Sequence, residues 1–137
     1  MLYIIRRVTF SAAHRLHNLK LSDKENKNIY GECNNPNGHG HNYVLEVTVR
    51  GNVPDKTGMV IDLKDLKKII TENIIEKVDH KYLNKDVDFM SDIIPTAENL
   101  VIQFWKILKE VLLENNAELY ELKLYETENN IVVYRGE

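Results

Sequence analysis

Apolar and polar residues alternate in two long stretches of the N-terminal half of the chain. The first runs from Leu2 to His14 and the second from about His39 to Arg50. In each stretch the apolar side chains share one parity, which is typical of a strand with one buried face. Arg6 breaks the parity of the first stretch, so we expect part of that face to contact water. The chain therefore begins with two predicted strands.

Polar segments follow each of these strands. Lys20–Asn28 is rich in charged and amide side chains and predicts a surface loop. Gly51–Gly58 contains Pro54 and a turn sequence, and it ends the second strand.

Helical periodicity appears in two segments of the second half. The first begins at Asp62, a good N-cap with Asp65 three residues later, and continues with apolar residues at helical spacing. The second is indicated by Pro95 and Thr96, with Thr96 as the N-cap and Glu98 in the first turn. We therefore expect two helices.

Two more strands are predicted at about Leu119–Glu126 and Ile131–Arg135, joined by a tight connection. The order strand, strand, helix, helix, strand, strand fits an α+β fold, in which a four-stranded antiparallel sheet carries both helices on one face. A length of 137 residues suits one such domain, residues 1–137. Four short strands leave two edges, so we expect an oligomer in which neighbouring subunits close them.

Composition narrows the class of protein. Hydrophobic residues make up 43% and charged residues 28%, an ordinary globular balance. The single cysteine excludes an intramolecular disulfide and is compatible with a reducing compartment. No apolar run approaches the roughly 18 residues of a membrane span, and a net charge of -3 gives no general attraction to nucleic acid. We expect a small cytoplasmic protein with no membrane or nucleic-acid partner.

Three histidines are candidates for a metal site. His39 and His41 are two residues apart, so on a strand both imidazoles leave the same face and can chelate zinc. Two hydrogen-bonded structural histidines are the alternative. His14 is the best third ligand, because it ends a strand on an otherwise apolar parity. Three imidazoles leave one zinc position open for substrate or water, as catalytic sites do.

Cys33 lies in a polar turn rich in glycine and asparagine, where apolar burial is not expected. Near a zinc-bound substrate its pKa can fall toward neutrality, which would make the thiolate usable as a base. The alternative is a fourth zinc ligand, which would make the site structural.

Three further polar residues are candidates for chemistry. Asp79 precedes His80, and a neighbouring carboxylate raises the basicity of an imidazole and fixes its orientation. A surface helix end nevertheless explains the bare dipeptide better. Glu126 has the parity of Leu122 and Leu124, which places a carboxylate on a mostly apolar face. Such a carboxylate usually has a partner or a ligand, unless it is solvated at an edge.

Taken together, these residues and their flanking motifs resemble the 6-pyruvoyl-tetrahydropterin synthase family over essentially the whole chain. Ala97 is a departure, because close relatives often carry a second threonine beside Thr96. The motifs that carry the resemblance are Phe10–His14, Tyr30–Tyr43, Gly58–Leu63, Asp79–Leu83, Pro95–Asn99 and Tyr125–Asn130.

The resemblance implies the tunnelling fold, in which subunits form a barrel of antiparallel strands with helices outside. It implies homohexamers, built as two trimers face to face, with active sites at the subunit interfaces. It also implies roles for single residues. One Zn²⁺ per subunit would be held by His14, His39 and His41, the proton-transfer triad would be Cys33, Asp79 and His80, and Glu126 would anchor the pterin ring with Thr96 nearby.

The implied reaction belongs to tetrahydrobiopterin biosynthesis. A carbon–oxygen lyase converts 7,8-dihydroneopterin triphosphate into 6-pyruvoyl-tetrahydropterin and triphosphate, and Mg²⁺ can accompany the triphosphate. The motifs assign no cations to that triphosphate. Two alternatives stay open: the related 6-carboxy-tetrahydropterin synthase of queuosine biosynthesis, and a non-catalytic zinc-stabilised protein that binds pterin or serves as a scaffold.

Overall fold

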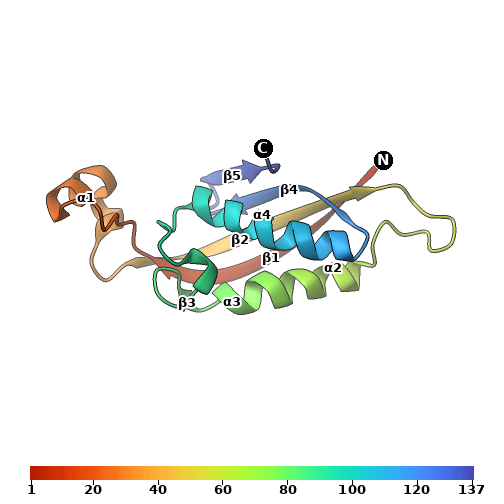
Figure 1. The fold of residues 1–137 in the computed structure, drawn as a ribbon, viewed down its shortest axis with the longest axis horizontal. Helices are drawn as coiled ribbons and strands as arrows, with labels where there is room; N and C mark the ends of the chain where they lie inside the picture. The colour runs from red at the N-terminus through yellow and green to blue at the C-terminus, as the bar shows by residue number, and fades with distance from the viewer.

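A five-stranded sheet in the order β3-β1-β2-β4-β5 forms the centre of the molecule (Figure 1). The computed structural model describes residues 1–137. The strands are β1 (Leu2–His14), β2 (His39–Gly51), β3 (Lys81–Tyr82), β4 (Glu118–Tyr125) and β5 (Ile131–Tyr134).

The two longest strands, β1 and β2, pair antiparallel along their whole length, from Leu2 opposite Gly51 to His14 opposite His39. β4 pairs antiparallel with β2, with an irregularity at Thr48 and Val49, and β5 pairs antiparallel with β4. The expectation of four antiparallel strands is therefore wrong by one strand. β3 has only two residues, too few for a periodic signal, and it pairs parallel to the end of β1.

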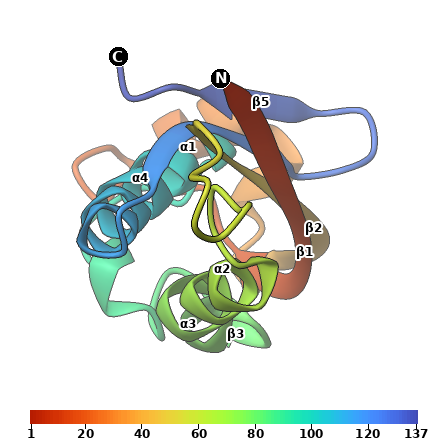
Figure 2. The ribbon, with the colours of Figure 1, turned by 90° about the vertical axis from the view of Figure 1, so that its right-hand side faces the viewer.

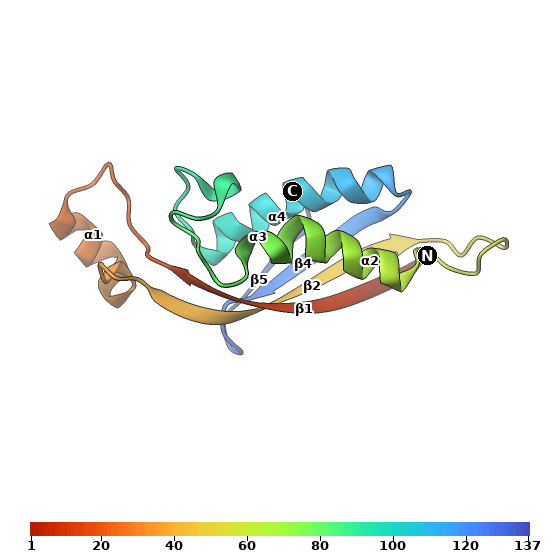
Figure 3. The same ribbon diagram turned by 90° about the horizontal axis from the view of Figure 1, so that it is seen from below.

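Two long helical segments cover one face of the sheet. The first comprises α2 (Leu63–Ile70), a π-helical turn (Thr71–Ile75) and α3 (Glu76–Val78), and the second is α4 (Ala97–Glu114). Asp62 and Thr96 cap them, as predicted. Figures 2 and 3 show both segments on the same side of the sheet, with no element over the opposite face.

The core lies between the sheet and these helices. Its largest fully buried side chains include Tyr43 and Leu45 from β2, Leu66 from α2 and Phe104 from α4. The parity predicted for β1 holds in its second half, where Phe10, Ala12 and His14 are buried. Arg6, which broke that parity, is half-buried.

A third helix occupies part of the predicted Lys20–Asn28 loop, so that expectation is also wrong. α1 (Asp23–Tyr30) lies beyond the end of the sheet and is followed by a 3-10 turn, Gly31–Asn34 (Figure 3). A capping box between Ser22 and Glu25 starts the helix, which explains how so polar a segment becomes helical. No helix in the structure combines the length and the apolar character needed to cross a membrane.

Candidate active site

His14, His39 and His41 meet where β1 ends and β2 begins. His14 is the last residue of β1 and lies directly opposite His39, the first residue of β2, while His41 is opposite Ala12. The register therefore brings all three imidazoles together, and their ligand nitrogens lie within 4.8 Å of one another. His14 Nε2 is 3.1 Å from His39 Nε2.

The start of α4 orients His14. The Pro95 carbonyl oxygen, just before the N-cap of α4, is 2.7 Å from His14 Nδ1. A carbonyl oxygen can only accept, so Nδ1 carries the proton and Nε2 presents its lone pair to the other two histidines. The Tyr43 hydroxyl lies 3.4 Å from the same Nδ1.

Burial favours the neutral form of two of these histidines, His14 and His41. It lowers the pKa of His14 and of His41 below the ordinary value for histidine, and the Glu126 carboxylate, whose Oε1 is 4.0 Å from His41 Nε2, opposes the shift only partly. His41 Nε2 is buried and has no hydrogen-bond partner. Neutral imidazoles with free lone pairs are the form in which histidine binds a metal. The cluster can hold a metal ion, and its three nitrogens match the ligand set of catalytic zinc sites.

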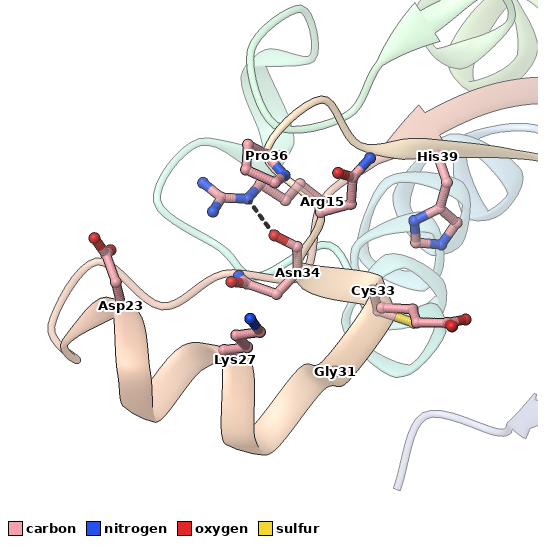
Figure 4. A pocket seen from close by; sticks show the side chains of 10 residues that line it. Arg15, Asp23, Lys27, Gly31, Cys33, Asn34, Pro36 and His39 are labelled. Atoms are coloured by element: carbon pink, nitrogen blue, oxygen red, sulfur yellow. Dashed lines mark hydrogen bonds between the residues drawn. The ribbon is translucent and has the colours of Figure 1, made fainter.

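Cys33 lies beside this cluster and outside its ligand set. It is half-buried in the 3-10 turn after α1, where its carbonyl oxygen accepts a hydrogen bond from the Leu16 amide at 2.9 Å. Together with His39 it lines a cavity of about 1100 Å³ (Figure 4). The thiol therefore has access to a molecule that is held next to the histidines.

Asp79 and His80 form a pair after α3. One Asp79 oxygen accepts a hydrogen bond from the Ser11 amide at 2.9 Å, and the other is 3.0 Å from His80 Nδ1. The Ser11 contact, together with His80, lowers the pKa of Asp79. His80 has a left-handed backbone with φ 61°, and its own amide donates to the Ser11 carbonyl. These bonds tie the pair to β1 and leave the imidazole exposed.

The Asp79–His80 pair and Cys33 do not share a cavity within one subunit. His80 and His41 line a second cavity of about 510 Å³, to which Cys33 does not contribute. The two remaining candidates are connected to the histidines in other ways. Glu126 follows β4 and approaches His41, and Thr96 caps α4 next to Pro95, its hydroxyl oxygen accepting from the Asn99 amide at 3.2 Å.

Some residues at this site are not indicated by the sequence pattern. The contact of the Pro95 carbonyl with His14 cannot be predicted from the sequence. Every residue has a carbonyl group, and only the fold determines which one lies next to the imidazole. Tyr43 did leave a signal, since it continues the parity of His39 and His41. Arg15 and Lys27 also line the Cys33 cavity. The sequence does not predict the position of Lys27, because its polar segment reads as a loop and is in fact helical.

Known proteins resemble this chain along its full length. Residues 3–137 match the family model of 6-pyruvoyl tetrahydropterin synthase. The 6-pyruvoyl tetrahydrobiopterin synthase of Poecilia reticulata is 55% identical over 98% of this chain and 90% of that protein. The Homo sapiens protein of the same name is 51% identical over 98% of this chain and 91% of its own length.

A solved structure agrees with these relatives. The 6-pyruvoyl tetrahydropterin synthase of Caenorhabditis elegans superposes with a TM-score of 0.92 at 46% identity, covering 99% of this chain and 96% of that one. A 6-carboxy-5,6,7,8-tetrahydropterin synthase from Rickettsia typhi is more distant, at 32% identity over 96% of this chain and 99% of that protein. The chain therefore belongs to the 6-pyruvoyl tetrahydropterin synthase family.

Proposed function

We propose that this protein is a zinc-dependent 6-pyruvoyl-tetrahydropterin synthase. It converts 7,8-dihydroneopterin triphosphate into 6-pyruvoyl-tetrahydropterin and triphosphate, and the side chain is oxidised as the ring is reduced, so no external reductant is needed. The observation that carries the proposal is the cluster of three histidines, in which His41 Nε2 has no hydrogen-bond partner, next to a cavity lined by Cys33 and His39. Bound by His14, His39 and His41, Zn²⁺ would supply a Lewis acid for the side-chain hydroxyls of the substrate.

In this proposal Cys33 is the base. Its thiolate would take a proton from a carbon of the substrate side chain, because Cys33 lines the cavity and is outside the metal-ligand cluster. Asp79 stays ionised at neutral pH, since its pKa is lowered, and it orients His80 through Nδ1. His80 Nε2 is then free to exchange a proton with the thiol or the substrate.

Glu126 and Thr96 are the proposed pterin contacts. A carboxylate accepts two parallel N–H bonds from the amino-pyrimidinone edge of a pterin, which is a planar bidentate match. The approach of Glu126 to His41 would place that ring next to the metal. The Thr96 oxygen already accepts the cap bond, so its hydroxyl proton remains available to a ligand.

The triad is completed between subunits in this proposal, because Cys33 and His80 line separate cavities of one chain. A homohexamer with the tunnelling fold, built as two trimers, would bring the Cys33 cavity of one subunit to the Asp79–His80 pair of another. Most of the outer edge of β1 is unpaired, because β3 reaches only Ala12 and Ala13. That edge and the edge of β5 are the surfaces by which strands would join.

The test is product analysis by mass spectrometry, after zinc-loaded protein is incubated with 7,8-dihydroneopterin triphosphate. We expect 6-pyruvoyl-tetrahydropterin and triphosphate. Formation of 6-carboxy-tetrahydropterin with acetaldehyde would assign the protein to the related synthase instead. Recovery of unchanged substrate by a fully zinc-loaded protein would favour the non-catalytic pterin-binding or scaffold protein.

A further inference from the structure

The Cys33 cavity has a second, cationic end. Figure 4 shows Cys33 and His39 on one side of the cavity, and the Arg15 guanidinium with the Lys27 amine on the other. None of the ion pairs in the structure includes Arg15 or Lys27. Two cations without a carboxylate partner therefore face the same cavity as the proposed base.

Arg15 is held rigidly. The Asn84 side chain accepts from the Arg15 amide at 2.8 Å and donates to its carbonyl oxygen at 2.7 Å. Arg15 Nε donates to the Asn34 carbonyl oxygen at 3.0 Å (Figure 4). With Nε occupied, the two terminal NH₂ groups have no partner in the structure. A fixed planar guanidinium with free terminal donors is well suited to phosphate oxygens.

Lys27 reaches the cavity from α1, whose position is fixed by the buried Asn26. The Asn26 side chain accepts from the Asn18 amide at 2.7 Å and donates to the carbonyl oxygens of Asn18 and Ser22 at 2.9 and 3.0 Å. The Lys27 amine itself makes no hydrogen bond within the chain. Asp23 and Glu32 also line the cavity, so a general positive field is excluded and any anion must be bound by local contacts.

We propose that Arg15 and Lys27 form the subsite for the phosphate chain of a polyphosphate ester. The inference rests on the proposed function, which requires a triphosphate to be held while it leaves. The volume of about 1100 Å³ is ample for a ligand whose reacting carbons lie by Cys33 and His39 and whose phosphates extend to the cationic end. Arg15 directly follows the candidate metal ligand His14, so the two ends of the cavity are positioned by adjacent residues.

The test uses inorganic triphosphate as the probe and calorimetry on the zinc-loaded full chain. Loss of a charge-assisted contact should weaken binding by roughly ten- to a hundredfold in Arg15→Gln and by at least about fivefold in Lys27→Glu. The matched control is Lys24→Glu, which makes the same charge change three residues earlier on α1 but does not line the cavity. It should bind within about twofold of the wild type, since exposed charges outside the site are largely screened.

A second probe separates phosphate recognition from damage to the site. Dihydroneopterin, which has no phosphate, should bind Lys27→Glu as tightly as it binds the wild type, and zinc content should not change. The Lys27 amine makes no hydrogen bond within the chain, so this variant is informative even if Arg15→Gln loses stability with its Asn34 contact. Equal weakening of triphosphate binding in Lys27→Glu and Lys24→Glu, or wild-type binding in Lys27→Glu, would overturn the proposal.

The subsite and the proposed function can fail separately. A wild-type protein that forms 6-pyruvoyl-tetrahydropterin, while both cavity variants bind triphosphate normally, would refute the subsite and leave the function standing. A wild type that forms no product, but whose triphosphate binding depends on Arg15 and Lys27, would support the subsite and refute the function.

Discussion

His14 is fixed at one ring nitrogen by a backbone carbonyl and turns the other nitrogen toward two more histidines. That arrangement leaves His41 Nε2 buried without a partner, which costs free energy in the metal-free protein and is relieved when a metal binds. At the scale of single residues, the three histidines are therefore arranged to bind a metal ion. A structural pair of histidines would satisfy its own hydrogen bonds.

Replacing His41 tests this reading. We expect His41→Ala to lose most bound zinc, because two imidazoles remain of three. The free energy of unfolding of the metal-free variant should lie within about 1 kcal/mol of that of the metal-free wild type, because the substitution removes an unsatisfied buried nitrogen together with the ring. Metal analysis after dialysis and denaturant unfolding are the measurements, with His80→Ala as the control that loses a histidine outside the cluster. Full zinc content in His41→Ala would exclude His41 as a ligand.

Replacing Cys33 tests the role of the thiol. Cys33→Ala should keep its zinc and its affinity for pterin, because the sulfur is outside the cluster of ligands. Turnover should fall by about 10²–10⁴-fold, the usual effect of removing a general base. Steady-state rates and metal content measured on the same sample decide between the two roles. Loss of zinc together with activity would point to the closed structural site.

At the scale of elements, α1 shows why some of the fold was predictable and some was not. β1 and β2 are predictable from the sequence because each buries one face over much of its length, and this produces an alternation of apolar and polar residues. α1 has a single buried residue, Asn26, and depends on a capping box and on hydrogen bonds to the preceding loop. β3 exists only because its two residues pair with the end of β1. Neither element has a hydrophobic pattern to recognise.

The buried amide of α1 provides the prediction at this scale. Asn26→Ala would leave the Asn18 amide without a partner and would remove one of the two hydrogen bonds at each of the Asn18 and Ser22 carbonyl oxygens, so we expect a loss of about 1–3 kcal/mol in the free energy of unfolding. The Michaelis constant for the triphosphate substrate should rise, because α1 forms one wall of the Cys33 cavity. Asn28→Ala, an exposed amide on the same helix, is the control. An unchanged Michaelis constant in a destabilised Asn26→Ala would separate α1 from substrate binding.

At the scale of the whole molecule, the sheet has unpaired edges at β5 and along most of β1. Its open edges carry exposed apolar side chains, with Ile5 of β1 59% and Val133 of β5 48% exposed. Apolar residues on an unpaired edge are a liability in a monomer and are normally covered by another chain. The separation of Cys33 from the Asp79–His80 pair leads to the same conclusion, because the proposed triad needs a second subunit.

A charge at the edge should therefore disrupt assembly. We expect Ile5→Lys to shift the protein from its oligomer toward smaller species, with activity lost in proportion and zinc retained by the separated subunits. Sedimentation velocity combined with metal analysis measures both. Leu19→Lys, at an exposed apolar residue in the loop before α1, should leave the sedimentation unchanged. A wild type that sediments as a monomer with full activity would contradict the shared active site.

The most direct test of zinc-dependent catalysis follows both products of one reaction. Metal-free protein and protein reconstituted with zinc are each mixed with 7,8-dihydroneopterin triphosphate without a reductant, and triphosphate and 6-pyruvoyl-tetrahydropterin are quantified over time. We expect the two products to appear in equal amounts, and only in the zinc-reconstituted sample. Equal rates in the metal-free sample, or release of acetaldehyde in place of the pyruvoyl product, would contradict the proposed function.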